Sequence, residues 1–90
     1  MATHKSALKR HRQSLVRRER NRQVKGGIRK GTKRVHAALA VGDLETAQEW
    51  LQITIKRLDK AAEKGVIHKN NAARRKSRLT RLVNRAISAQ

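Results

Sequence analysis

Residues 42–66 read GDLETAQEWLQITIKRLDKAAEKGV, and this stretch decides the fold. Apolar side chains recur in it every three or four residues, the spacing that places them on one face of an α-helix. That face consists of Leu44, Ala47, Leu51, Ile55, Leu58 and Ala62. The pattern predicts an amphipathic helix over about 44–64.

Both ends of this predicted helix carry capping residues. Gly42 suits the left-handed position that ends a preceding helix, and Asp43 can accept a hydrogen bond from the first amide groups of the next. At the other end, Gly65 can take the same left-handed conformation while Val66 packs on Ala61, as in a Schellman motif. The central helix is therefore expected to have a helix before it and another after it.

The flanking segments are also predicted to be helical, because the 90-residue chain contains no proline and shows no alternating apolar and polar run. We expect helices over about 5–41 and about 71–88, the last capped by Asn70 or Asn71. The expected apolar face of the first helix is Ile28, Val35, Ala38, Leu39 and Val41. That of the third is Ala72, Leu79, Leu82, Val83, Ala86 and Ile87, opposite Arg74, Arg78, Arg81 and Arg85.

These elements predict an all-α fold, a three-helix bundle in a single domain of residues 1–90. The N-terminal part of the first helix has few apolar residues to bury, namely Ala7, Leu8, Leu15, Val16 and Val24. It should therefore project beyond the bundle. Gly26, Gly27 and Gly31 each cost roughly 1 kcal/mol relative to Ala inside a helix, so a weak point or bend is expected there.

The charge of the chain is strongly unbalanced. It has 24 Lys and Arg residues against six acids, a formal net charge of +18 and a pI near 12.0. Residues 1–34 hold 13 basic side chains and one acid, residues 35–63 hold three and five, and residues 64–90 hold eight and none. Such an excess indicates a polyanionic partner, and it leaves the middle helix nearly neutral as a packing surface.

Like charges repel along the first helix. Pairs four residues apart, such as Lys5 with Lys9 and Arg18 with Arg22, together cost roughly 1 to 4 kcal/mol, comparable with much of a small domain's stability. When phosphates neutralise these side chains, the repulsion is removed and the same charges contribute to binding affinity. We therefore expect the stretch from His4 to Arg22 to order fully only against nucleic acid.

Recognition is expected to use the phosphate backbone, with Arg binding phosphates through two nitrogens and Lys acting as a point charge. The chain has no Phe or Tyr and a single Trp, so it lacks platforms for stacking unpaired bases. Trp50 is interpreted as a packing residue.

Catalytic and metal sites are not predicted. The chain has no cysteine, and His4, His11, His36 and His68 have no carboxylate or second histidine at a spacing that builds a ligand set. The acids are explained by exposure and local pairs such as Lys56 with Asp59. We expect no enzyme, no cofactor, no metal and no small-molecule substrate, and a cytoplasmic location without a signal peptide or membrane span.

Two alternatives fit the charge alone. A DNA-compacting architectural protein would need bulky apolar wedges, which are few in the basic segments. A membrane-active cationic helix would need a larger apolar face than the first helix offers.

Two strings narrow the choice: HKSALKR at residues 4–10 and GVIHKNNAARRKSRL at residues 65–79. Together with GDLETAQ at residues 42–48, they closely resemble the S-twenty family of bacterial small-subunit ribosomal proteins, in the family's order across essentially the whole chain. The resemblance implies a three-helix bundle with a long first helix, present as a monomer within the small subunit, that binds small-subunit ribosomal RNA directly during early assembly. The chain departs from the family at Gly26, Gly27 and Gly31, where helix formers are common.

The resemblance points to RNA-facing candidates in both strings, and the charge of the first helix adds the basic residues between. Asn70 is open to two readings, a helix cap or an RNA contact. The candidates are His4, Lys5, Ser6, Lys9, Arg10, Arg12, Arg17, Arg18, Arg20, Arg22, Lys25, His68, Lys69, Asn70, Arg74, Arg75, Lys76, Ser77 and Arg78.

Overall fold

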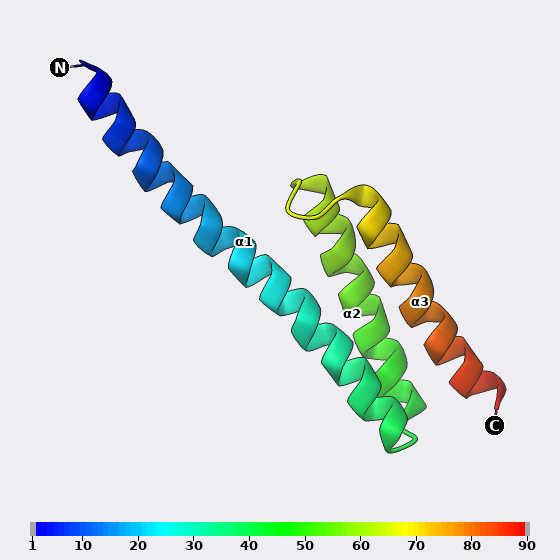
Figure 1. Cartoon of the computed structure of the whole chain (residues 1–90). Coiled ribbons are helices and arrows are strands. Elements are labelled where there is room, and N and C mark those ends of the chain that lie inside the picture. Colours follow the sequence, from blue (N-terminus) through cyan, green and yellow to red (C-terminus); the bar gives the residue numbers. More distant parts are fainter. Residues whose placement is uncertain (1, 90) are drawn as a thin grey trace.

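The computed structural model of the chain describes residues 2–89, with side chains from residue 5 onward. Three helices follow one another, α1 at Ala2–Ala40, α2 at Leu44–Glu63 and α3 at Lys69–Ser88. They form an elongated molecule of 68 × 22 × 13 Å. In Figure 1, α2 lies between α1 and α3, and the N-terminal half of α1 extends past the α2–α3 turn. The predicted all-α bundle with a projecting first helix is confirmed.

Both turns use the predicted glycines. Gly42 and Gly65 have φ angles of 76° and 77°. At the end of α1, the amide of Gly42 donates to the carbonyl of Leu39, and that of Asp43 donates to Ala38. At the end of α2, Gly65 donates to Ala62 and Val66 donates to Ala61. These pairs are the two hydrogen bonds of a Schellman motif, so α1 and α2 end by the same device.

Asp43 begins α2 as expected. Its carboxylate accepts a hydrogen bond from the backbone amide of Thr46 at 3.1 Å and another from the Thr46 hydroxyl at 2.6 Å. The hydroxyl bond first and the amide bond second lower the pKa of Asp43 below its ordinary value of 3.8. The ionised carboxylate is therefore the form that stabilises the start of α2.

The predicted cap of α3 is wrong. Neither Asn70 nor Asn71 occupies the cap position, which belongs to His68 in an extended conformation. The Nδ1 atom of His68 accepts a hydrogen bond from the amide of Asn70 at 3.1 Å. Because an imidazole nitrogen can replace the usual oxygen acceptor, α3 begins at Lys69, two residues earlier than expected.

The core consists of two apolar clusters along α2. One joins Ile28 of α1, Leu58 and Ala61 of α2 and Ala72 of α3, and Val66 packs against it. The other joins Val35, Leu51, Leu79 and Val83, with Trp50 packed at its edge. The predicted faces of α2 and α3 are confirmed, and so is Trp50 as a packing residue. The prediction that Val41 belongs to the apolar face of the first helix is wrong, because Val41 lies in the turn and is 80% exposed.

Gly31 explains how α1 approaches α2. The helix runs unbroken through Gly26, Gly27 and Gly31, and Figure 1 shows no kink there, so the expected weak point is not a break. Gly31 is buried, and a Cβ atom on it would overlap the hydroxyl of Thr54 and lie 3.3 Å from the Thr54 Cβ. The missing side chain therefore lets the two backbones come close.

Thr54 is fully buried, and its polar group is satisfied locally. Its hydroxyl donates a 2.7 Å hydrogen bond to the carbonyl of Trp50 one turn earlier. Next to this crossing, Arg57 Nη1 donates to the carbonyl of Gly27 at 2.7 Å. The guanidinium groups of Arg34 and Arg57 each lie 5.8 Å from the centre of the Trp50 ring, so cation–π attraction adds to the α1–α2 contact.

We predict that Gly31→Ala destabilises the bundle by about 1 to 3 kcal/mol, because Thr54 is buried and moving its hydroxyl out of the way would disturb its hydrogen bond to Trp50. Gly26→Ala is the matched control, since nothing lies within 4 Å of its added Cβ. That change should stabilise by up to about 1 kcal/mol through helix propensity. Urea unfolding followed by Trp50 fluorescence measures both, and a Gly31→Ala protein as stable as Gly26→Ala would contradict the close crossing.

The Asp43 cap predicts how the stability of the protein depends on pH. Since the folded pKa of Asp43 is lowered, its contribution to stability is complete above the unfolded value near 3.8 and is lost as the pH falls through the lower folded value. Asp43→Asn keeps an acceptor for the cap but cannot titrate there. The difference in unfolding free energy between the two proteins should therefore shrink as the pH drops from 6 to 2. If the difference in unfolding free energy stayed constant over this pH range, the ionised carboxylate of Asp43 would not be what stabilises the start of α2.

Candidate nucleic-acid interface

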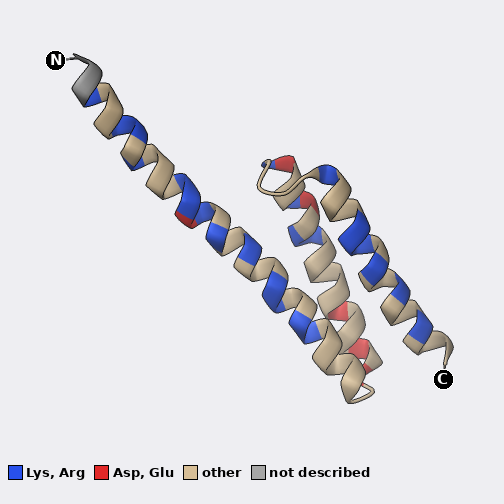
Figure 2. Ribbon diagram, in the orientation of Figure 1, with Lys and Arg blue, Asp and Glu red and all other residues tan. Residues whose placement is uncertain are grey.

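The N-terminal part of α1, residues 5–25, forms an arm that lies largely in solvent. Every side chain in it is exposed except Asn21 and Val24, which are half-buried. Figure 2 shows basic residues along the whole arm and one acid, Glu19. That carboxylate accepts only a long hydrogen bond of 3.5 Å from Gln23. No described partner balances the arm's cations.

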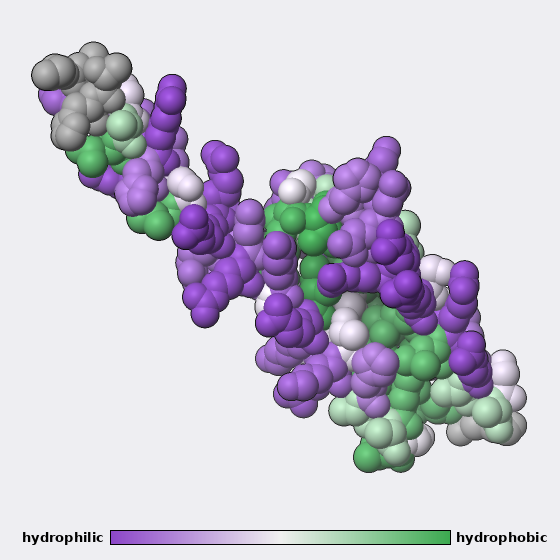
Figure 3. Space-filling model, in the orientation of Figure 1, coloured by the Kyte–Doolittle hydropathy of each residue, from purple (hydrophilic) through white to green (hydrophobic). Residues whose placement is uncertain are grey.

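The apolar residues in the outer part of the arm do not attach it to the bundle. Leu8, Leu15 and Val16 are 52%, 49% and 56% exposed. Figure 3 accordingly shows the arm mostly hydrophilic and the hydrophobic surface gathered over the bundle. Only Val24, at the base of the arm, packs against the cluster of Ile28 and Leu58. Helical order in the rest of the arm thus has little support from tertiary packing, which is the usual source of helix stability in proteins.

Two shallow basic grooves follow the flanks of the arm, on either side of Arg17. The first is lined by Ser14, Arg17, Arg18, Asn21, Arg22, Lys25 and Arg29. The second is lined by Lys9, Arg12, Gln13, Val16, Arg17 and Arg20. Each presents guanidinium groups with amide or hydroxyl groups between them, the donor set that phosphate and ribose oxygens accept from.

The candidates at the tip of α1 are separated from those of α3. Lys5, Ser6, Lys9 and Arg10 are exposed near the free end of the arm. His4 lies in α1, and its side chain is outside the described ones. Figure 1 places this end far from α3. The two diagnostic strings therefore do not form one site; they mark separate places along the molecule.

The candidates in and just before α3 differ in whether they are free to bind a partner. His68, Lys69, Asn70, Arg74, Arg75, Ser77 and Arg78 are exposed. Lys76 is different, because its Nζ atom lies 2.6 Å from the Asp59 carboxylate of α2 and forms the one ion pair among residues 5–89. The expected pair of Lys56 with Asp59 is therefore wrong, since Asp59 reaches across to α3. Lys76 holds α2 and α3 together, and His68 is engaged as the helix cap.

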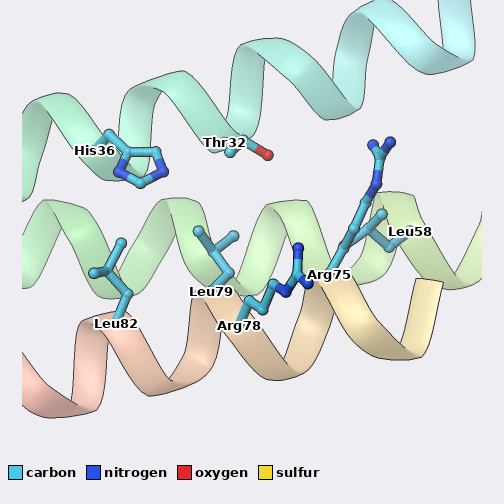
Figure 4. Close-up of a pocket in the computed structure, with 7 residues that line it drawn as sticks. All are labelled: Thr32, His36, Leu58, Arg75, Arg78, Leu79 and Leu82. Atoms are coloured by element: carbon cyan, nitrogen blue, oxygen red, sulfur yellow. The ribbon is translucent and has the colours of Figure 1, made fainter. Parts of the chain in front are cut away.

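A third groove lies between α1 and α3, with α2 as its floor. Figure 4 shows Thr32 and His36 on α1 facing Arg75, Arg78, Leu79 and Leu82 on α3, with Leu58 behind them. Its volume is about 430 Å³. The sequence analysis did not single out Thr32 or His36 for binding. A signal was present, because both continue the spacing of three or four residues from Lys25 and Arg29.

Other kinds of site find no support in the part of the chain that the structure describes. Among residues 2–89, no group of three or more His, Cys, Asp or Glu side chains could hold a metal ion. Within the same range, no helix is both long and apolar enough to cross a bilayer.

Comparison with known proteins identifies the family of the chain. The sequence model of the family described as ribosomal protein S20 matches residues 2–84. The chain belongs to the ribosomal protein S20 family. A relative from Solidesulfovibrio magneticus, named small ribosomal subunit protein bS20, is 54% identical over 89 residues, covering 99% of this chain and all of its own length.

Two further relatives carry the same name. The protein from Geotalea daltonii is 54% identical over 84 residues, covering 93% of this chain and 97% of its own. That from Bacillus cytotoxicus is 49% identical over 84 residues, covering 93% and 99%. The predicted family is confirmed, and this member of the S20 family aligns with its relatives over nearly their full length.

Proposed function

We propose that this S20 family member is a structural constituent of the small ribosomal subunit that binds small-subunit ribosomal RNA directly. Phosphate contacts carry the binding, and the bound protein stabilises the folding of the RNA during assembly. It acts as a monomer within the particle, without catalysis. The observation that carries this proposal is the arm, a long helix that is exposed over nearly its whole length and has cations on its flanks.

The arm is suited to RNA because its two basic grooves point to different sides of one helix. Arg17 and its neighbours can neutralise phosphates on both flanks, which releases counterions and removes the repulsion within α1. Ser6 near the tip of the arm and Ser77 on α3 are exposed hydroxyls that follow Lys5 and Lys76 in the sequence and can donate to phosphate or ribose oxygens. Arg74 and Arg78 extend the basic surface to α3.

The bundle serves as the rigid support of this surface. The crossing at Gly31 and Thr54, the Arg57 bond to Gly27 and the Lys76–Asp59 pair join the three helices independently of RNA. We infer that the bundle folds first and the arm becomes fully ordered on the RNA.

We predict that the free protein has less helix than the RNA complex, with the deficit in residues 5–25. Amide hydrogen exchange should show little protection there in the free protein and strong protection in the complex, while amides of α2 are protected in both. Full protection of the arm without RNA would show that its repulsion is overcome within the chain.

We also predict that the double variant Arg17→Gln with Arg18→Gln binds small-subunit ribosomal RNA more weakly. Its plot of log affinity against log salt should be less steep by about one for each phosphate contact removed. Lys56→Gln is a single-charge control on the exposed side of α2, away from both grooves of the arm.

Duplex DNA measured at the same ionic strengths tests the architectural alternative. RNA binding stronger than DNA binding supports the proposal. Equal binding of both, or an unchanged slope in the double variant, would contradict it.

A further inference from the structure

We propose that the groove between α1 and α3 binds one unpaired nucleotide of the RNA, with its base against Leu82 and the guanidinium of Arg78 and its phosphate at Arg75. This site rests on the proposed function, since it takes its ligand from the RNA that the arm binds. It adds recognition of a single flipped-out base to a surface that otherwise contacts phosphates.

The groove differs from the basic grooves of the arm in having an apolar interior. Leu58 and Leu79 are 1% and 6% exposed and close its floor, while Leu82 is half-buried and offers accessible apolar surface. Its volume of about 430 Å³ falls within the range of small-ligand sites. A phosphate alone would leave this apolar surface unused, whereas a base would cover it.

The rim supplies groups of the right chemistry. Arg75 and Arg78 are exposed, extend from α3 toward α1 in Figure 4, and make no hydrogen bond or ion pair among residues 5–89. A guanidinium plane can stack on a base where no aromatic side chain is present, and a second guanidinium can bind the adjoining phosphate. The Thr32 hydroxyl donates to the carbonyl of Ile28 at 3.0 Å, so its oxygen can still accept a bond from a base or ribose.

The position of the groove makes it continuous with the arm. Arg18, Lys25, Arg29, Thr32 and His36 follow one another at three- and four-residue steps or their sums, which places them on the same flank of α1. Arg18, Lys25 and Arg29 line the first of the two basic grooves of the arm. Thr32 and His36 line the groove between α1 and α3. A strand whose phosphates follow this flank reaches the α1–α3 groove directly.

The charge around the groove favours a nucleotide over a protein segment of ordinary composition. No acid lies among the lining residues, and α3 has no acid at all. The site is thus positive at the rim and apolar within, which matches a nucleotide extruded from a backbone.

Crosslinking gives a direct test, because the chain contains no cysteine. His36→Cys, labelled with a short photoactivatable group, is bound to full-length small-subunit ribosomal RNA in the presence of the other small-subunit proteins. Ala37→Cys is the matched control, one residue along α1 and exposed. We expect the label at position 36 to react with one unpaired nucleotide that the label at position 37 does not reach. Reaction with a protein, or with paired nucleotides only, would overturn the site.

A charge-matched pair of variants gives an independent test. Arg78→Gln and Arg81→Gln each remove one cation from exposed positions of α3, but only Arg78 lines the groove. At high salt, where general phosphate attraction is screened, Arg78→Gln should weaken RNA binding about tenfold more than Arg81→Gln. Trp50 fluorescence checks that both variants are folded.

The two levels of the proposal fail in different ways. Absence of RNA binding by the unmodified protein would contradict the proposed function itself. Normal binding with equal effects of Arg78→Gln and Arg81→Gln would overturn the nucleotide site alone.

Discussion

Electrostatic repulsion between two basic helices constrains this molecule. α1 and α3 both carry excess cations, and they touch each other much less than either touches α2. The nearly neutral α2 separates them and supplies the groups that bind to each side. Arg57 of α2 donates to the backbone of α1, and Asp59 of α2 pairs with Lys76 of α3. Together with the two apolar clusters along α2, these contacts join α1 and α3 to the same central helix.

This arrangement also produces the groove. Since α1 and α3 stay apart above α2, a space remains between them with Leu58 below and basic side chains at its edge. The groove thus combines cationic side chains at its rim with apolar side chains inside.

The close approach of α1 to α2 has a steric origin. Small residues at a crossing let backbones approach, and here Gly31 accepts the branched side chain of Thr54. Hydrogen bonding of the Thr54 hydroxyl to Trp50 makes its burial affordable in a small core. The glycine that weakens helix propensity therefore contributes packing, and the net effect depends on the neighbour rather than on the residue itself.

Much of the architecture was predictable because it is encoded locally. The stripe of α2 follows from helical periodicity, and the turns at Gly42 and Gly65 follow from the left-handed conformation that glycine tolerates. The His68 cap was missed because oxygen acceptors at Asn70 and Asn71 lie nearby and are the commoner choice. Thr32 and His36 were missed because neither is a Lys or Arg and neither lies in one of the two diagnostic strings, and their relevance depends on what α3 places opposite them.

The sequence by itself determined the three helices, the turns at Gly42 and Gly65, the unbalanced charge of the arm and the family, because periodicity, capping and charge are properties of neighbours along the chain. Only the tertiary structure decided that Gly31 meets Thr54, that Asp59 pairs with Lys76 rather than Lys56, and that Thr32 and His36 of α1 line one groove with Arg75 and Arg78 of α3. Each of these contacts joins residues of different helices, and their meeting depends on the rotation and separation of the helices, which side-chain packing sets.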